Sequence, residues 1–312
     1  MVKLLQNRVA ESRLALPAML AFAVAVWLLS GLPTKGWWPQ MGCFMVTTYL
    51  MVELNNVHAL IRIYSRMVSC TFIALSCCAC MLFPSLREAL MQLFITAATL
   101  ILFTTYQDKA SPGKTYYAFV CFGLASIAYV HVVFLLPVVW LLTAVYLMSL
   151  SWRTLAASLL GLLTPYWFGG CWLLFKQDFS PLTAHFAALA DFSQPFDFQL
   201  LSAGQIALYV FVGLLAVIST IHFIRKSYND KIRTRMFYAF FIWTDLLAMV
   251  LLAVQPQHYD ALMRLMILST APLAGHFIAL TSTKLTNAVF ILLTGCSLLL
   301  TLYNLWSMSS LS

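Results

Sequence analysis

The chain has 312 residues, of which 62% are apolar and 9% are charged, whereas soluble domains carry about 25% charged residues. Because about 20 residues are needed for one membrane crossing, apolar spans use nearly the whole length, and this excludes a soluble domain of ordinary size. The net charge of +8 then predicts orientation across a lipid bilayer and not binding to nucleic acid.

Apolar runs separated by polar turns predict an all-α, polytopic bundle that forms one integral membrane domain over residues 1–312. Backbone groups inside hydrocarbon have to bond internally, so each run should be helical. We expect about 11 spans, within a range of about 10–12. They are 14–32, 41–56, 67–84, 89–105, 116–130, 132–150, 154–174, 203–224, 236–254, 262–281 and 286–306. The stretch 116–150 forms either two short spans or a re-entrant hairpin, and both leave the downstream topology unchanged.

The first apolar run follows a basic segment, as in a signal sequence. The run is long and the segment 31–34 (GLPT) is a poor cleavage site, so we expect a retained signal anchor with a cytoplasmic N-terminus. With that orientation, presumed cytoplasmic segments hold 14 of the 18 basic residues, five of them in the loop 225–235 (RKSYNDKIRTR). The positive-inside rule then favours a multi-pass protein of the cell (inner) membrane.

The eight cysteines fall mostly within apolar runs and are predicted to be small packing residues. The segment 77–80 (CCAC) has a spacing found in metal clusters, but no histidine or second cysteine pair accompanies it at ligand spacing. No metal site or cofactor is predicted, and a divalent cation remains an alternative without a supporting motif. The sequence identifies no protein partner.

Three ionisable residues fall at membrane depth: Glu53, Asp245 and His276. Such groups are functional candidates by default. The alternatives are structural. Asp245 would pair with His276 or a threonine, or be protonated. His276 would be a satisfied core histidine, and Glu53 would form an ion pair with Arg62 at the inner surface.

The longest polar connection, 176–201, is predicted to face outward. It carries Asp178, Asp191, Asp197 and His185 among phenylalanines, and 183–192 can form a short amphipathic helix. Phe-rich amphipathic segments beside spans lie at the headgroup level. The connection is therefore either a passive interfacial anchor or a lid that contacts substrate, since loops of this length are uncommon unless functional or disordered.

The middle of the chain carries a further pattern. The segment 122–129 (FGLASIAY) is followed by 135–142 (LLPVVWLL), a basic turn at 151–153 (SWR), a Gly-Leu-Leu span and the long outer loop. Later, 258–273 runs from a His-Tyr-Asp triplet through an arginine to Pro-Leu. Over roughly residues 85–281 this arrangement resembles the central module of polytopic glycosyltransferases that use polyprenyl-phosphate-linked sugars, the GT-C superfamily. The whole chain also resembles an uncharacterised family of bacterial multi-pass membrane proteins.

The resemblance implies a protein that handles a polyprenyl-phosphate-linked sugar at the outer face of the membrane, either as a transferase or as a relative without catalysis. The chemistry needs a carboxylate as general base, or to orient a metal or acceptor. The first outer loop, 33–40 (PTKGWWPQ), contains no acid, unlike that of the family. The catalytic role would therefore fall to Glu88, or to a loop aspartate such as Asp178 or Asp191.

The other site residues implied by the resemblance would bind the substrate. Arg87 and Arg264 would hold phosphate, because arginine suits bidentate phosphate contacts. His131 and His258 would contact the sugar or the phosphate. Arg264 enters an apolar stretch, so it should either extend outward or bind something anionic.

Two other functions stay open. A transporter or flippase would use Asp245, His276 and Glu53 as buried titrating groups, although the chain shows no internal repeat of the kind common in that class. A non-catalytic subunit of a membrane complex would need none of these residues, and its tryptophans would be ordinary interface anchors.

Overall fold

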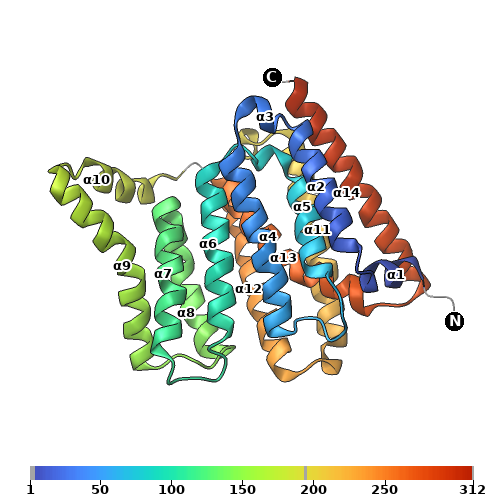
Figure 1. Cartoon of the computed structure of the whole chain (residues 1–312), viewed down its shortest axis with the longest axis horizontal. Helices are drawn as coiled ribbons and strands as arrows, with labels where there is room; N and C mark the ends of the chain where they lie inside the picture. Colours follow the sequence, from blue (N-terminus) through green and yellow to red (C-terminus); the bar gives the residue numbers. More distant parts are fainter. Residues whose placement is uncertain (1–3, 193–194, 311–312) are drawn as a thin grey trace.

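The protein is almost entirely helical, and each predicted span coincides with a helical segment (Figure 1). The computed structural model describes residues 4–192 and 195–310, and no strand occurs within these ranges. The first half contains α1 (Leu5–Glu11), α2 (Ala15–Leu29), α3 (Leu32–Lys35), α4 (Trp38–His58), α5 (Met67–Cys78), η1 (Cys80–Leu82), α6 (Leu86–Phe103) and α7 (Pro112–Ala128). The second half contains η2 (Val130–Leu135), α8 (Leu136–Val145), α9 (Trp152–Lys176), α10 (Ser180–Ala187), η3 (Ala188–Ala190), η4 (Phe198–Leu200), α11 (Ala203–Lys226), η5 (Ser227–Asn229), α12 (Ile232–Val254), η6 (Pro256–His258), α13 (Tyr259–Leu280) and α14 (Lys284–Ser310).

Six of the described helices are long and apolar enough to cross a bilayer: α6, α9, α11, α12, α13 and α14. The bent pair α1 and α2, with a 90° break, would make a seventh. Two further apolar segments, α5 and η2–α8, are shorter. This is the architecture of a multi-pass helical membrane protein, but the helices that meet this test are fewer than the eleven predicted spans. α4 has the length to cross, and its last turns carry Glu53, Asn55 and Asn56, which lower its hydropathy.

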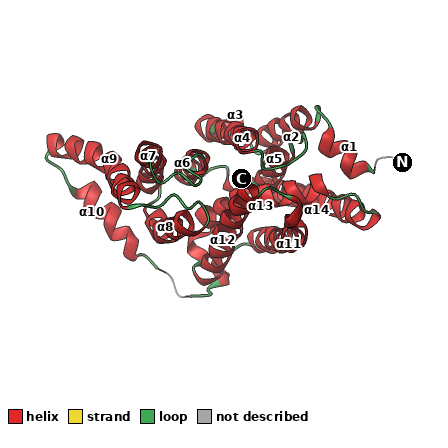
Figure 2. Cartoon of the chain, turned by 90° about the horizontal axis from the view of Figure 1, so that it is seen from below, coloured by secondary structure: helices red, strands yellow, loops and turns green. Residues whose placement is uncertain are grey.

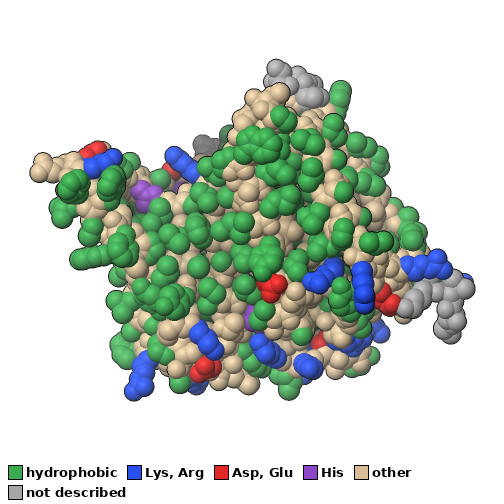
Figure 3. Space-filling model, viewed as in Figure 1, with side chains coloured by type: hydrophobic (Ala, Val, Ile, Leu, Met, Phe, Trp, Pro, Cys, Tyr) green, Lys and Arg blue, Asp and Glu red, His purple; other side chains and the backbone are tan. Residues whose placement is uncertain are grey.

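The helix connections gather at two opposite edges of the bundle, here named the upper and lower edges as they lie in Figure 1. Connections at the same edge form hydrogen bonds with one another. At the upper edge Gln40 donates to the backbone oxygen of Pro84 (3.1 Å), and at the lower edge the backbone N–H of Gln107 donates to Leu147 (2.8 Å). Lys and Arg side chains gather along the lower edge, and a mostly hydrophobic band lies above them (Figure 3).

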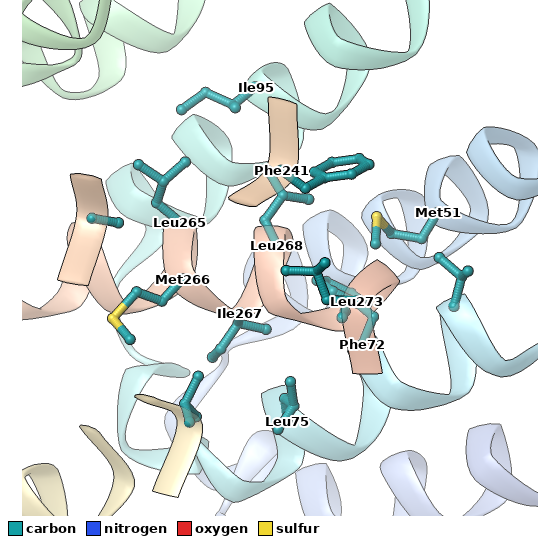
Figure 4. Close-up of a cluster of buried hydrophobic side chains, with 14 of the residues drawn as sticks. Met51, Phe72, Leu75, Ile95, Phe241, Leu265, Met266, Ile267, Leu268 and Leu273 are labelled. Atoms are coloured by element: carbon teal, nitrogen blue, oxygen red, sulfur yellow. The ribbon is translucent and has the colours of Figure 1, made fainter. Parts of the chain in front are cut away.

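Helix α13 is the core of the bundle. It lies between α5 on one side and α11 and α12 on the other (Figure 2). Of its 22 residues, 18 are buried. Its side chains Leu265, Met266, Ile267, Leu268 and Leu273 lie among side chains of the neighbouring helices (Figure 4). A Cβ at Gly275 would lie 2.9 Å from the backbone nitrogen of Val68, so glycine is what permits α13 to approach α5 this closely.

Helices α7 and α9 form a second close pair, and most of α9 is exposed. A Cβ at Gly161 would lie 2.4 Å from the backbone oxygen of Tyr116, and one at Gly123 would lie 2.7 Å from that of Leu162. Small residues at a helix interface allow such contact without a hydrophobic driving force in lipid. Only four of the 25 residues of α9 are buried. α10 extends from the upper end of α9 back toward the bundle (Figure 1).

Candidate functional site

A cavity of about 290 Å³ lies at the upper edge, where the turn between α7 and α8 meets the ends of α12 and α13. Its inner walls are apolar. Its rim carries the polar and aromatic residues Tyr129, His131, Gln255, His258 and Phe192. The other lining residues are apolar: Met91, Val132, Phe134, Leu135, Leu251, Ala261, Leu262 and Leu265. Phe134 is exposed, whereas Met91, Val132, Leu135, Ala261 and Leu265 are buried.

A chain of hydrogen bonds fixes the rim. Gln257 donates from its Nε2 to the backbone oxygen of Asp191 (2.7 Å) and also lies 3.0 Å from Nε2 of His258. Since an amide nitrogen only donates, His258 accepts at Nε2 and carries its proton on Nδ1. That nitrogen lies 2.7 Å from the Tyr129 hydroxyl. The neutral His258 therefore donates its Nδ1–H to the Tyr129 hydroxyl oxygen. The Tyr129 hydroxyl can then donate its own proton to another acceptor.

His131 lies against this chain. Its ring centroid is 4.1 Å from that of His258 and 6.1 Å from that of Phe192. Neither ring nitrogen makes a well-formed hydrogen bond among the described residues, although the backbone of Ala188 and Asp191 lies nearby. The long connection 176–201 thus contributes Asp191 and Phe192 to the cavity rim, and two histidines predicted to contact substrate come together there.

Three carboxylates lie within electrostatic range of the Tyr129 hydroxyl: Glu88, Asp260 and Asp191. Asp191 is on the long connection, whereas Glu88 and Asp260 are on helices. These two sit in the first turns of α6 and α13 respectively, where the helix dipole favours negative charge. Of the predicted acids, Glu88 and Asp191 therefore lie near the cavity rim, and Asp260 is an acid there that was not predicted.

Arg264 is placed differently from the prediction. Its guanidinium neither extends outward nor lines the cavity. It donates to the backbone oxygen of Leu82, to Ser85 and, over 3.2 Å, to Oε1 of Gln92. These bonds join α13 to the turn between η1 and α6, so most of its donor capacity is used within the fold. Phosphate binding by Arg264 would require breaking these bonds.

Arg87 is exposed beside the end of α10. Burial lowers the pKa of His185 below its usual value, and the nearby Arg87 guanidinium lowers that pKa further. His185 also lines a smaller cavity of about 190 Å³ between α9 and α10, together with Tyr166. The Tyr166 hydroxyl donates to Oγ of Ser126 (2.9 Å) and lies 3.3 Å from Nε2 of His185. Arg87 is therefore an exposed cation near His185 and the smaller cavity that His185 lines.

The remaining loop aspartates have local roles. Asp178, at the junction of α9 and α10, accepts from the backbone N–H (2.9 Å) and hydroxyl (2.6 Å) of Ser180. These bonds hold the pKa of Asp178 below its usual value. Asp197 accepts from the backbone N–H of Gln199 (3.2 Å). Asp178 lies at the far end of α9 from the bundle (Figure 1), so the structure does not bring it to the Tyr129–His258 rim.

A separate cluster lies at the lower edge. His276 Nε2 is 2.9 Å from Oδ2 of Asp230, and Arg62 lies 3.9 Å from Oδ1 of the same carboxylate. Asp230 belongs to the predicted basic loop 225–235. Arg62 thus pairs with Asp230 and not with Glu53. The physical reason is that α4 ends at His58, where Ala59 adopts a left-handed conformation (φ 48°), so Arg62 leaves the helix that carries Glu53.

Asp245 is buried between α12 and α13. Its Oδ2 accepts from the Thr270 hydroxyl (2.9 Å), whereas Oδ1 has no hydrogen-bonding partner within the described residues. Of the partners predicted for Asp245, the structure provides a threonine, because His276 is bound to Asp230.

The cysteines at 77, 78 and 80 are buried with free thiols. In the part of the chain that the structure describes, no group of three or more His, Cys, Asp or Glu residues could hold a metal ion.

Sequence reasoning missed several residues of the rim. Tyr129 ends the segment 122–129 that carries the resemblance, and Phe192 ends the predicted helix 183–192, but neither is predicted to be a site residue. Gln257, which bonds to His258 at the rim, carries no signal of its own. Asp260 stood next to His258 and Tyr259 in one triplet, which was the available hint. At the lower edge, Asp230 was the single acid in a basic loop, and that isolation could have singled it out.

Comparisons with protein-family models, with curated proteins and with solved structures found no match for this chain.

Proposed function

We propose that this protein binds a polyprenyl-phosphate-linked sugar at its upper edge, with the isoprenoid chain in the 290 Å³ cavity and the polar head at the rim. The observation that carries the proposal is the pairing of an apolar cavity with a rim of Tyr129, His131 and His258. Ligand sites of this kind combine apolar walls with a few placed polar groups. A lipid-linked sugar has the same division into an apolar chain and a polar head.

The rim residues suit the head group. Beside the rim, either Glu88 or Asp260 would accept the single proton of an attacking hydroxyl, the general-base role that glycosyl transfer needs. Tyr129, held by His258, would donate its remaining proton to a phosphate or sugar oxygen. Arg87 would supply the positive charge for the phosphate, because Arg264 is bonded within the fold. Phe192 would cover the bound chain as part of a lid.

The membrane arrangement that fits this function is eleven helical crossings with the N-terminus and the lower edge in the cytoplasm of the cell (inner) membrane. The alternation of connections between two edges supports that count, with α4, α5, α7 and η2–α8 as shorter or more polar crossings in addition to the apolar ones. The gathering of basic side chains at the lower edge supports the orientation (Figure 3). The cavity then opens at the outer face.

The test is the pool of lipid-linked sugars in cells that lack the gene, measured by mass spectrometry beside the parent. We expect an accumulated polyprenyl-phosphate sugar, or a glycan that lacks one residue. Tyr129→Phe and Glu88→Gln should fail to restore the parental pool. Tyr117→Phe is the matched control, because Tyr117 lies on α7, the helix that precedes Tyr129, and its side chain is exposed. Unchanged pools in the deletion strain would contradict the proposal.

One observation favours a second candidate, a transporter or flippase: the Asp245 carboxyl is buried with one oxygen free of partners among the described residues. Ionisable groups inside the membrane commonly serve transport. This candidate predicts that Asp245→Asn abolishes function while Glu88→Gln is mild. The glycosyl-handling proposal predicts the reverse, so the same complementation assay separates them.

A further inference from the structure

A larger cavity lies at the opposite side of the bundle from α9. It has a volume of about 530 Å³ and lies between α2, α5 and α14, with α13 contributing one residue and α1 closing its lower end. Small residues make the space: Ala15 and Ala18 on α2 and Ala74 on α5 all line it. Nothing in the proposed function uses this cavity.

The cavity has the depth of one membrane leaflet. Its lining on α14 runs from Phe290 to Thr301. At a rise of 1.5 Å per residue this stretch is about 16 Å long, and half of a hydrocarbon core of ~30 Å is about 15 Å. A fatty-acyl chain that descends from one headgroup layer would fill this length.

The cavity can be reached sideways from the bilayer. Within residues 284–308 of α14, only Thr301 and Asn304 are buried. Ala18 on the facing helix α2 is exposed. Both helices pack on α5, which forms the back wall. The side of the cavity between α2 and α14 therefore faces the lipid of the bilayer.

The lower end carries the features of a headgroup layer. α1 turns 90° away from α2, and its Gln6 side chain anchors it by donating to the backbone oxygen of Ile278 (2.7 Å). Ser12, at the elbow between α1 and α2, lines the cavity. The exposed charged residues around it are Arg8, Glu11 and Arg13, which together carry a net positive charge. A helix in this orientation lies in the membrane interface, where basic side chains attract anionic lipid.

From the leaflet depth, the lateral opening and the basic elbow together, we infer that this cavity binds one acyl chain of an anionic phospholipid from the leaflet at the lower edge, with the lipid phosphate beside Arg8 and Arg13. The apolar walls hold the chain, and the elbow selects the charge of the headgroup. The site would retain lipid whether or not the upper-edge cavity binds a lipid-linked sugar, so the two claims can fail separately.

The test uses the full protein reconstituted in bilayers of equal amounts of phosphatidylglycerol and phosphatidylcholine, then extracted in mild detergent for native mass spectrometry. We expect the wild type to retain one phosphatidylglycerol. Ala74→Phe places a ring in the cavity and should lower retention about tenfold, which is the effect of excluding about two buried CH₂ groups. Ala21→Phe is the matched control on α2, because Ala21 is exposed and does not line the cavity.

The headgroup is tested by replacing Arg8 and Arg13 with Ala, which should bring retention of the two lipids to the same level. Thermal unfolding shows whether each variant is folded, and Ala18→Phe, at the exposed mouth, provides a second filling variant if Ala74→Phe does not fold. Equal retention in filling variants and in Ala21→Phe would overturn the acyl-chain site. Equal retention of both lipids by the wild type would overturn the selection of an anionic lipid.

Discussion

Filling the upper-edge cavity should separate its function from the stability of the fold. Ala261 on α13 is buried (3% exposed) and lines the cavity, so Ala261→Phe would place a ring in the space. Burying that side chain contributes about 2 kcal/mol, and crowding costs about 1–3 kcal/mol. We therefore expect the free energy of unfolding to change by no more than about 1 kcal/mol.

The effect on binding should be much larger. If the ring displaces about four chain carbons at about 0.8 kcal/mol each, the lost binding free energy is about 3 kcal/mol, or about a hundredfold in affinity. The assay is restoration of the lipid-linked sugar pool in the deletion strain, with thermal unfolding in detergent as the fold check. Ala253→Phe, on α12 but outside the cavity lining, is the control. A folded Ala261→Phe variant that restores the parental pool would refute the reasoning.

Three further predictions concern the fold. Arg264→Gln should lower the free energy of unfolding by about 3 kcal/mol, because it removes several partly buried hydrogen bonds of a charged group; an unchanged melting temperature would contradict this role. Gly161→Ala should destabilise by about 1–3 kcal/mol through its clash with α7, whereas Gly169→Ala, with open space around its Cα, should stabilise by about 0.5–1 kcal/mol; equal shifts would show that the close approach is not needed. Asp230→Asn should lower the free energy of unfolding by about 2 kcal/mol, because it weakens the contact with His276. Denaturation that matches the wild type would show that this contact does not stabilise the fold.

The helices could be predicted from the sequence because apolar runs in lipid have to be helical, and their ends lie within a few residues of the predicted ones. The number of helices that cross the membrane is harder to predict from the sequence. α5 is short and enclosed by neighbouring protein, with ten of its 12 residues buried. α4 is long enough, but the polar residues of its last turns lower its hydropathy.

The site could be predicted only in part. His131 and His258 were singled out one by one, but their contact at 4.1 Å depends on how the α7–α8 turn meets α13, and no local pattern encodes that meeting. Arg264 shows the opposite case. An arginine in an apolar stretch is predicted to extend outward or to bind an anion, but the backbone oxygens of Leu82 and Ser85 accept its N–H groups instead. Such partners lie far away in the sequence and leave no trace in residue type.

The most direct test of the upper-edge site is photolabelling of the purified protein with a polyprenyl phosphate that carries a photoreactive group on its chain. The account predicts labelling of peptides that contain Tyr129–Leu135 and Leu251–Leu265, competition by unlabelled polyprenyl phosphate, and loss of label in Ala261→Phe. Labelling that is confined to α2 and α14, or that persists unchanged in Ala261→Phe, would contradict the central claim that the upper-edge cavity holds the isoprenoid chain.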